Sequence, residues 1–191
     1  MPILQGETFV SPVGLFEDGE LTTEADHSWW VLHTHSRMEK QLARIAVAEE
    51  IAFFLPLYVH RWSNQGRVFK SRLPLFPGYL FIYTSARAHH KFKATRAVAH
   101  VLAVNDQERL YADLRRVYRL ITSEAPMTPE QQLTPGRRVS IRAGPFRGYE
   151  GTLLKRGKEL RLLIAVDFMR QGVSVEVESW MVTPAADTGS L

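Results

Sequence analysis

The sequence contains no cysteine, and this absence excludes disulfide bonds and thiolate metal sites. Its apolar runs, such as Leu162 to Val166, are far shorter than the roughly 20 residues that a membrane-spanning helix needs. The start of the chain lacks the basic segment of a secretory signal. We therefore expect a cytoplasmic protein with neither disulfides nor a membrane span.

One long stretch of the sequence lacks basic residues, and another lacks acidic residues. Residues 1–27 hold no Lys or Arg and carry a net charge of −6, whereas residues 28–122 hold fifteen Lys and Arg against six acids. No acid occurs between Ile51 and Asn105. A field of one sign favours a polyanion or an acidic protein surface as partner, although a basic surface that only aids solubility has the same composition.

Composition divides the chain into five segments. Residues 1–27 contain prolines and glycines without sustained periodicity, which is typical of a flexible extension, with one short ordered patch expected near Leu15 and Phe16. Residues 123–134 hold two prolines and no periodicity, which is typical of a linker. The predicted segments are an acidic extension at 1–27, a first domain at 28–122, a linker at 123–134, a second domain at 135–184 and a tail at 185–191.

The first domain is predicted to be a compact α+β domain, an antiparallel sheet flanked by helices. Ser36 and Glu39 have the spacing of a capping box, in which both side chains satisfy free amides at the start of a helix. Asn105 or Asp106 is expected to cap the last helix. The predicted elements are strands at 29–34, 54–62, 67–70, 79–83 and 98–104, helices at 37–52 and 86–94, and a long helix with Leu110, Leu114, Val117 and Ile121 on one face.

The second domain is predicted to be a small barrel of about five strands, closed because open sheet edges are a liability. Apolar and polar residues alternate along 138–142 and 173–177, which indicates half-buried antiparallel strands. Glycines in the 144–151 segment are expected at turns that require a positive φ. Residues 158–171 also have helical propensity, but the alternating valines favour strands, and we predict a barrel in the free protein.

Two motifs in order resemble a known family. The first reads PLFPGYLF over residues 74–81, followed by Thr95-Arg96 and Val98. The second reads Gly136-x-x-Val139-x-Ile141-x-x-Gly144-Pro145-Phe146-x-Gly148-x-x-Gly151 and is similar to a KOW motif. Together with Trp29-Trp30, they resemble the NusG family of transcription factors, in which an N-terminal domain is joined to a KOW barrel. The resemblance covers nearly everything from Ser28 to Pro184.

The resemblance implies a transcription elongation and antitermination factor that is not an enzyme and needs no cofactor. In the family, outward aromatic side chains of the first motif form an apolar patch that binds the clamp helices of RNA polymerase and suppresses pausing. Aromatic anchors in an apolar groove typically dominate such an interface. For Trp30, a surface and a core position are both open. Carried over by motif, the patch consists of Trp30, Phe76, Pro77, Tyr79, Phe81 and Val98.

His89 and His90 are the only tempting metal or acid–base pair in the sequence. Adjacent histidines on a helix point about 100° apart, so they make a poor metal pair, and we expect a solvated pair and no metal. The resemblance offers them a contact with the polymerase lobe opposite the clamp. The sequence Ala88-His89-His90-Lys91 does not match the threonine-rich segment of some family members.

Four basic residues are candidates for binding DNA. Lys91, Lys93 and Arg96 form a basic run, and Arg37 begins the first predicted helix. A solvated helix face is the ordinary interpretation of such charges. The resemblance places this surface near the non-template DNA strand, where phosphate contacts would give salt-sensitive binding that is indifferent to sequence.

The second domain is expected to recruit a partner. Phe168 occupies a position that resembles the exposed aromatic by which NusG proteins bind termination factor Rho or a small-subunit ribosomal protein, with Met169 as the competing position. Phe146 is either a core residue or an exposed tip. The acidic extension and the leucine-rich second long helix depart from housekeeping NusG proteins, and the PLFPGYLF motif resembles specialised paralogs of the RfaH type, which suggests an operon-specific antiterminator. We expect the protein to be a monomer. The alternative function is that of a KOW protein associated with RNA or the ribosome.

Overall fold

The computed structural model describes residues 9–17, 26–132 and 136–185. The chain divides into two compact units, Met1–Ala112 and Asp113–Leu191, which we call the N-terminal and C-terminal units. The division falls inside the long helix α3 (Gln107–Thr122), ten residues before the boundary predicted at residue 122.

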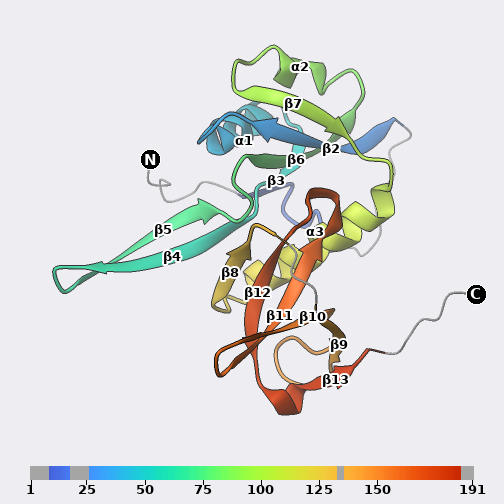
Figure 1. The fold of residues 1–191 in the computed structure, drawn as a ribbon. Helices are drawn as coiled ribbons and strands as arrows, with labels where there is room; N and C mark the ends of the chain where they lie inside the picture. Colours follow the sequence, from blue (N-terminus) through green and yellow to red (C-terminus); the bar gives the residue numbers. More distant parts are fainter. Residues whose placement is uncertain (1–8, 18–25, 133–135, 186–191) are drawn as a thin grey trace, which may run out of the picture. The chain divides into compact units, whose positions relative to one another are not determined.

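The N-terminal unit is built on a five-stranded antiparallel sheet with strand order β1-β3-β6-β2-β7 (Figure 1). The centre of this sheet is β6, whose apolar residues pair with β2 on one side and with β3 on the other. The predicted α+β character of this unit is therefore confirmed. The strands are β1 (Val10–Ser11), β2 (His27–Thr34), β3 (Ala52–Phe54), β6 (Tyr79–Ser85) and β7 (Val98–Ala103).

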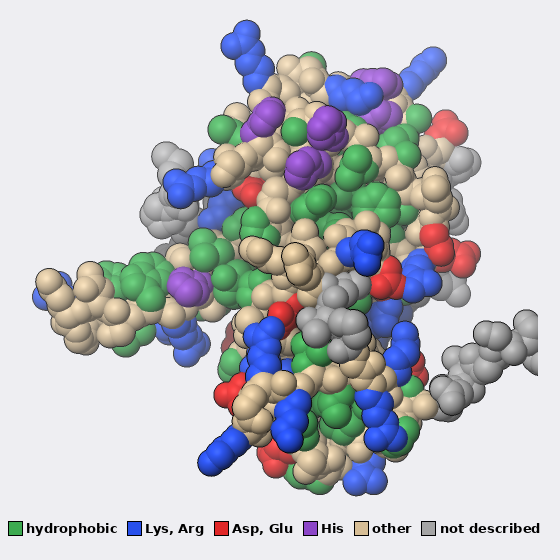
Figure 2. All heavy atoms as spheres, in the orientation of Figure 1, with side chains coloured by type: hydrophobic (Ala, Val, Ile, Leu, Met, Phe, Trp, Pro, Cys, Tyr) green, Lys and Arg blue, Asp and Glu red, His purple; other side chains and the backbone are tan. Residues whose placement is uncertain are grey.

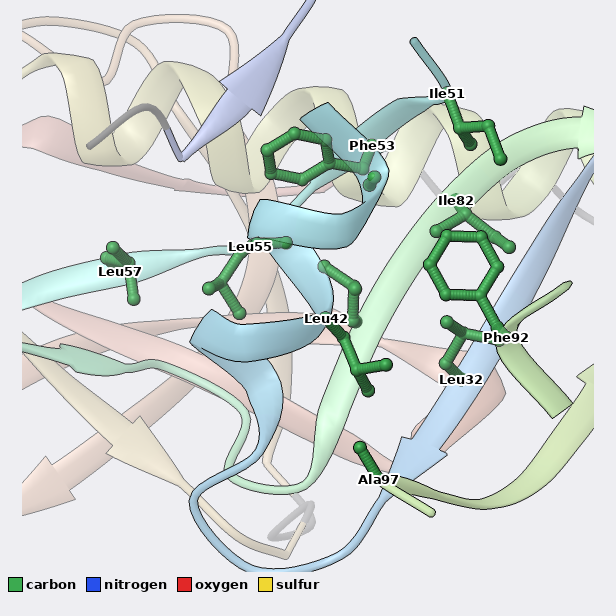
Figure 3. Close-up of a cluster of buried hydrophobic side chains, with 12 residues drawn as sticks. Leu32, Leu42, Ile51, Phe53, Leu55, Leu57, Ile82, Phe92 and Ala97 are labelled. Atoms are coloured by element: carbon green, nitrogen blue, oxygen red, sulfur yellow. The ribbon is translucent and has the colours of Figure 1, made fainter. Parts of the chain in front are cut away.

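One face of this sheet packs against helix α1 (Glu39–Ala48) and the short helix α2 (His90–Lys93). Apolar positions at helical spacing on α1, among them Leu42 and Ala46, are fully buried there against Leu32 and Ile82 of the sheet (Figure 3). Burial of a large aliphatic side chain such as Leu42 contributes about 1.5–3 kcal/mol, and this cluster is the main aliphatic core of the unit.

The predicted first residue of α1 and its predicted capping box are both wrong. The helix begins at Glu39, two residues later than predicted, because Arg37 has a positive φ of 64°. The Ser36–Glu39 capping box does not form, and the cap position Met38 makes no side-chain hydrogen bond. The Glu39 carboxylate is buried instead and accepts a hydrogen bond of 2.7 Å from the backbone N–H of Gly78. At the other predicted cap, Asp106 accepts a 2.9 Å bond from the Arg109 amide, which confirms it.

The predicted strand over 54–62 is two strands. It breaks at Leu55-Pro56, because proline has no N–H to donate to a sheet. After the break, β4 (Leu57–Asn64) and β5 (Arg67–Pro74) form a separate two-stranded hairpin. The two-residue turn between them has positive φ at both positions, 48° for Gln65 and 75° for Gly66, as a tight hairpin turn requires.

Part of the predicted flexible extension belongs to the fold. Val10 and Ser11 pair with β3 as the edge strand of the sheet. Phe16, where an ordered patch was predicted, is almost fully buried, and its ring lies 5.9 Å from that of Trp29 and 5.0 Å from that of Phe54. Residues 1–8 and 18–25, which carry much of the acidic charge, lie outside the described residues.

The C-terminal unit contains one antiparallel sheet of six strands in the order β13-β9-β10-β11-β12-β8. Five of these strands lie within the predicted barrel, and the alternating valines of β12 are buried as predicted. In the part of the chain that is described, β13 and β8 each pair on one side only, so closure of the barrel is not established. The strands are β8 (Met127–Glu130), β9 (Arg137–Ile141), β10 (Glu150–Arg156), β11 (Glu159–Val166), β12 (Gln171–Val177) and β13 (Val182–Pro184).

The sixth strand corrects the predicted linker. Met127–Glu130 pairs with β12, although the sequence around it has no periodicity. The reason is polar: the buried Glu130 carboxylate accepts hydrogen bonds from Ser174 Oγ at 2.5 Å and from Arg156 at 2.7 Å. The buried Arg161 guanidinium in turn donates to Thr128 and Ser174. This network holds β8 against the sheet, so residues 127–130 are not a linker.

Two shorter features of the C-terminal unit agree with the sequence. Gly144 and Gly148 have φ angles of 83° and 86°, the positive values predicted for the turn of the second motif. Residues 159–166 form β11 and are followed by a short 3-10 turn (Asp167–Met169), so the strand prediction for this ambivalent segment is confirmed and no long helix forms there.

Candidate functional site

The first motif forms a tight turn that leads into β6. The Leu75 amide donates to the Pro56 carbonyl at 2.8 Å, and the Gly78 carbonyl accepts from the Thr34 amide at 2.8 Å. Gly78 has a φ of 85°, and its own amide donates to buried Glu39. Bonds to three separate elements fix the turn, and β6 begins immediately after it at Tyr79.

Strand alternation places two aromatic residues of the motif, Tyr79 and Phe81, on the same face of β6. Tyr79, Phe81 and Tyr83 lie on one face of β6, opposite the face that packs on α1. Over most of its length this face is covered by aromatic side chains, since Phe54 lies 6.5 Å and Phe76 6.4 Å from the Phe81 ring. The prediction that Phe76 and Phe81 are surface anchors is wrong: they are 1% and 0% exposed and belong to the core.

Trp30 and Val98, two further residues of the predicted patch, lie on the other face of the sheet. Both pack against the cluster beneath α1 and α2, which is the face opposite to Tyr79. The Trp30 indole N–H donates to the Thr84 carbonyl at 3.2 Å, and its ring stacks on His89 at 4.1 Å. Trp30 and Val98 are therefore partly buried on the helix-covered face of the sheet, and neither side chain shares a face with Tyr79.

The exposed part of the predicted patch is a small rim at the end of the sheet. Pro77 is exposed and Tyr79 is half-buried. The strand register places His33 opposite Tyr79 on one side and opposite His100 on the other. The ring of His33 lies 5.2 Å from that of Tyr79 and 5.9 Å from that of His100, so the three rings form a row across β6, β2 and β7. We call Pro77, Tyr79, His33 and His100 the aromatic rim.

The two histidines of the aromatic rim were not among the residues predicted from the sequence. His33 lies at an odd position of β2, as Trp29 and Val31 do, so its face could have been predicted from alternation. His100 could not, because the pairing of β2 with β7 shifts register between His33 and Thr34. Only the structure fixes which residue of β7 lies beside His33.

His89 and His90 differ from each other. His89 is 6% exposed and lies between two rings, with Trp30 at 4.1 Å and His90 at 4.3 Å, so the prediction of a solvated pair is wrong for His89. Burial lowers the pKa of His89 below its usual 6.5, and the nearby His90 and Lys93 add to the effect. His90 is exposed and is the residue of the pair that can meet a partner.

The four predicted DNA-binding residues are exposed, but their charges are not equivalent. Lys91 forms an ion pair with Glu49, which neutralises it. Lys93 and Arg96 lie in and just after α2. Arg37 lies in a turn before α1, and a hydrogen bond of 2.9 Å from the His35 amide to the Ala97 carbonyl holds that turn beside Arg96.

The C-terminal unit presents one of its predicted partner residues clearly. Phe168 is exposed, Met169 is half-buried, and both lie in the 3-10 turn after β11. Phe146 is 5% exposed and packs edge-on against Tyr149 at 6.1 Å, which makes it a core residue.

A buried carboxylate of α3 holds the 3-10 turn in place. The Asp167 amide donates to Asp113 at 3.1 Å, and Arg116 pairs with the same carboxylate. Burial raises the pKa of Asp113 above 3.8 despite the opposing hydrogen bond and the Arg116 charge. The turn that exposes Phe168 is therefore anchored to a buried carboxylate of α3.

The described residues include no group of three or more His, Asp or Glu side chains arranged to hold a metal ion. Among the same residues, no helix is both long and apolar enough to span a bilayer.

Residues 27–121 match the protein family described as "Transcription termination factor nusG". Among solved structures, a chain of "Crystal Structure of MjSpt4:Spt5 complex conformation B" is 16% identical, with 81% of this chain and 95% of that chain covered. Its TM-score of 0.27 is too low for the similarity to carry a structural conclusion. No curated protein matches the sequence.

Proposed function

Because residues 27–121 match the NusG family, as the two ordered motifs and Trp29-Trp30 predicted, we propose that the chain is a transcription elongation factor that docks on the clamp helices of RNA polymerase. The observation that carries this proposal is the aromatic rim, where the motif reaches the surface through Pro77 and Tyr79. In this proposal the protein acts by binding RNA polymerase. It suppresses pausing of the polymerase and catalyses no reaction.

The rim suits a helix-in-groove contact. Tyrosine and histidine each offer a flat apolar body and a polar tip, and such side chains are frequent anchors at protein interfaces. The Gly78 turn is held by hydrogen bonds to Pro56, Thr34 and Glu39, so Tyr79 is presented by a rigid support. A preorganised anchor loses less conformational entropy on binding than one on a free loop.

The experiment compares two neighbouring tyrosine and phenylalanine positions of β6. Tyr79→Ala is expected to weaken polymerase binding by about 1–3 kcal/mol, roughly 5- to 150-fold, while the protein stays folded. Tyr79→Phe keeps the ring and serves as the matched control. Phe81→Ala is expected to lose stability instead, because Phe81 is fully buried. Affinity is measured by titrating purified polymerase, and folding by circular dichroism.

A folded Tyr79→Ala protein with unchanged polymerase affinity would exclude the rim as the docking surface. If the affinity for ribosomal RNA or ribosomes exceeds that for polymerase, the chain is instead a KOW protein associated with RNA or the ribosome. The similarity of residues 136–151 to a KOW motif is the observation that keeps this second function in view.

Two further contacts complete the proposed function. Arg37, Lys93 and Arg96, on adjacent turns, would hold the non-template DNA strand, with Lys91 joining them only if it leaves Glu49, and His90 would face the opposite polymerase lobe. In the C-terminal unit, Phe168 and Met169 would bind Rho or a small-subunit ribosomal protein. An operon-specific role in antitermination fits the specialised motif.

A further inference from the structure

The β4–β5 hairpin is the part of the N-terminal unit that its core does not explain. Its two strands pair only with each other among the described residues, and every residue from 59 to 70 is exposed. Figure 1 draws it as a long arm that extends away from the five-stranded sheet, and Figure 2 shows hydrophobic, Lys and Arg side chains along this arm. A free two-stranded ribbon gains little from burial, so its side chains need another explanation.

One face of the hairpin carries a row of aromatic rings. The register places Trp62 directly opposite Phe69, and their rings lie 5.5 Å apart with an angle of 18° between their planes. His60 continues the row at 5.7 Å from Trp62, and Tyr58 lies 6.3 Å beyond it. Trp62 and Phe69 each keep 41% of their surface exposed, an unusual position for large apolar side chains.

The opposite face is basic. Arg61 lies directly opposite Lys70, and Arg72 is the next cross-strand residue on the same face. In the described part of the chain no carboxylate pairs with any of the three, and the sequence has no acid from Ile51 to Asn105. Like charges directly opposite each other destabilise a hairpin, and a bound polyanion would remove that cost.

Aromatic rings and unpaired cations on one narrow ribbon match the chemistry of a nucleic-acid strand. Bases stack on aromatic side chains, and Lys and Arg neutralise the phosphates. The ribbon is only two strands wide, about 4.8 Å between strands, so long basic side chains can reach its edges from the opposite face. Stacking on the rings requires bases that are not already stacked in a duplex. We propose that the β4–β5 hairpin binds single-stranded nucleic acid through Trp62, Phe69, His60, Arg61 and Lys70.

This site is separate from the proposed polymerase and DNA contacts. It shares no residue with the aromatic rim or with Arg37, Lys91, Lys93 and Arg96, and it needs no polymerase to act. A second copy of the chain is a weaker candidate for the aromatic face, because two such ribbons would bring their basic side chains together. An apolar protein partner would leave Arg61 and Lys70 unmatched.

The test uses the full chain and labelled oligonucleotides of about 20 nucleotides, as single-stranded DNA, single-stranded RNA and a DNA duplex, with fluorescence anisotropy as readout. Trp62→Ala is expected to weaken single-strand binding by about 5- to 150-fold, the range for one base–aromatic stack. Trp62→Phe keeps a ring and retains most of the affinity. Val68→Ala removes an exposed apolar side chain from the basic face and leaves affinity unchanged. The DNA and RNA arms show which strand is preferred.

The paired charges are tested by salt. Arg61→Ala combined with Lys70→Ala is expected to weaken binding at low salt and to reduce the slope of log K against log salt by about 1.4, since each phosphate contact on a single strand contributes about 0.7. Lys93→Ala combined with Arg96→Ala is the charge-matched control. An equal loss in both double variants, with no loss in Trp62→Ala, would reduce the hairpin to non-specific charge and overturn the proposal.

Two other results would also overturn it. If the duplex binds more tightly than the single strands and Trp62→Ala leaves the affinity unchanged, the rings do not stack on bases. Concentration-dependent self-association in light scattering that Trp62→Ala abolishes would identify a second copy as the occupant of the aromatic face. Circular dichroism is expected to be unchanged in all variants, because the substituted side chains are exposed.

Discussion

The interiors of the two units differ in chemistry. In the N-terminal unit, the face of the main sheet opposite α1 is covered with aromatic rings, since Phe16, Trp29, Phe54, Phe76 and Phe81 are all less than 3% exposed. In the described part of the C-terminal unit Phe146 is the only buried aromatic residue, and the interior is aliphatic with a buried polar network around Glu130 and Arg161. The interior of the first unit is therefore stabilised mainly by the packing of side-chain shapes. The interior of the second is stabilised by packing together with charge pairing.

This difference teaches where sequence patterns succeed. Aliphatic residues that alternate along a strand reveal a half-buried sheet, whereas an aromatic residue has the same pattern in a core and in a binding face. The hairpin and the main sheet illustrate this, because Trp62 and Trp29 are both strand residues and only Trp29 is buried. Charged residues mislead in the opposite direction, since Glu130 looks like a linker residue and is 7% exposed.

The largest expected effect is in the aromatic interior. Phe16→Ala is expected to lower the free energy of unfolding by about 3–5 kcal/mol, because it removes a buried ring that packs on Trp29, Phe54 and Tyr111. Val13→Ala, in the same segment but 83% exposed, is the matched control and is expected to change stability by less than about 0.5 kcal/mol. Urea denaturation followed by circular dichroism measures both.

Equal small losses in both variants would show that residues 9–17 are an appendage and not part of the core. The comparison between the units would then break, because the aromatic interior would no longer depend on this segment.

The next effect is in the polar interior. Glu130→Ala is expected to cost about 1–3 kcal/mol, since it leaves the buried Ser174 hydroxyl without its acceptor and removes the partner of Arg156. Hydrogen exchange should rise in peptides that cover β8 and β12, whose pairing the network supports. Glu176→Ala, an exposed acid on β12, is the control and should leave exchange unchanged. Unchanged exchange in Glu130→Ala would mean that backbone pairing alone holds β8.

The units are also expected to respond to pH with opposite signs. In the C-terminal unit the pKa of Asp113 is raised above 3.8 by burial, so the folded state binds the proton more tightly than the unfolded state does. The free energy of unfolding therefore falls as pH rises from 3.8 through the raised pKa, by about 1.4 kcal/mol for each pH unit across that window. Asp113→Asn keeps an acceptor for the Asp167 amide and should abolish this fall. A fall that persists in the variant would assign it to another group.

In the N-terminal unit the pKa of His89 is lowered below 6.5, chiefly by burial. The unfolded state then binds the proton more tightly. The contribution of His89 to the free energy of unfolding is therefore fully present above pH 6.5 and is lost as pH drops through the lowered pKa. His89→Phe keeps a ring to stack on Trp30 and removes the titration. Stability of this variant is expected to vary less between pH 7 and pH 5 than that of the parent protein, and equal slopes would contradict the assignment.

The sequence was sufficient for the α+β class of the N-terminal unit, for the antiparallel strands of the C-terminal unit, for the family match and for most elements, because these depend on periodicity and on local motifs. It was not sufficient for the outward face of the first motif. Alternation places Tyr79 and Phe81 on the same face of β6, but it cannot show that Phe16 and its neighbours cover this face where Phe81 lies. Nor can it show that Glu39 caps the Gly78 turn instead of its own helix, since that contact joins residues 39 positions apart.

The smallest expected effect concerns the acidic residues of the first segment. Residues 1–27 carry a net charge of −6 and residues 28–122 a net charge of +9, so the segment can compete with nucleic acid for the basic surface, or it can serve solubility alone. A truncated protein beginning at Ser28 cannot separate these roles, because it also lacks the buried Phe16. Substituting Glu7, Glu20 and Glu24 by Gln removes three charges and keeps Phe16. Competition predicts DNA binding that is about twofold tighter at low salt, with the difference vanishing when the Debye length falls to about 3 Å at 1 M salt. Equal affinities at low salt would leave solubility as the role of these charges.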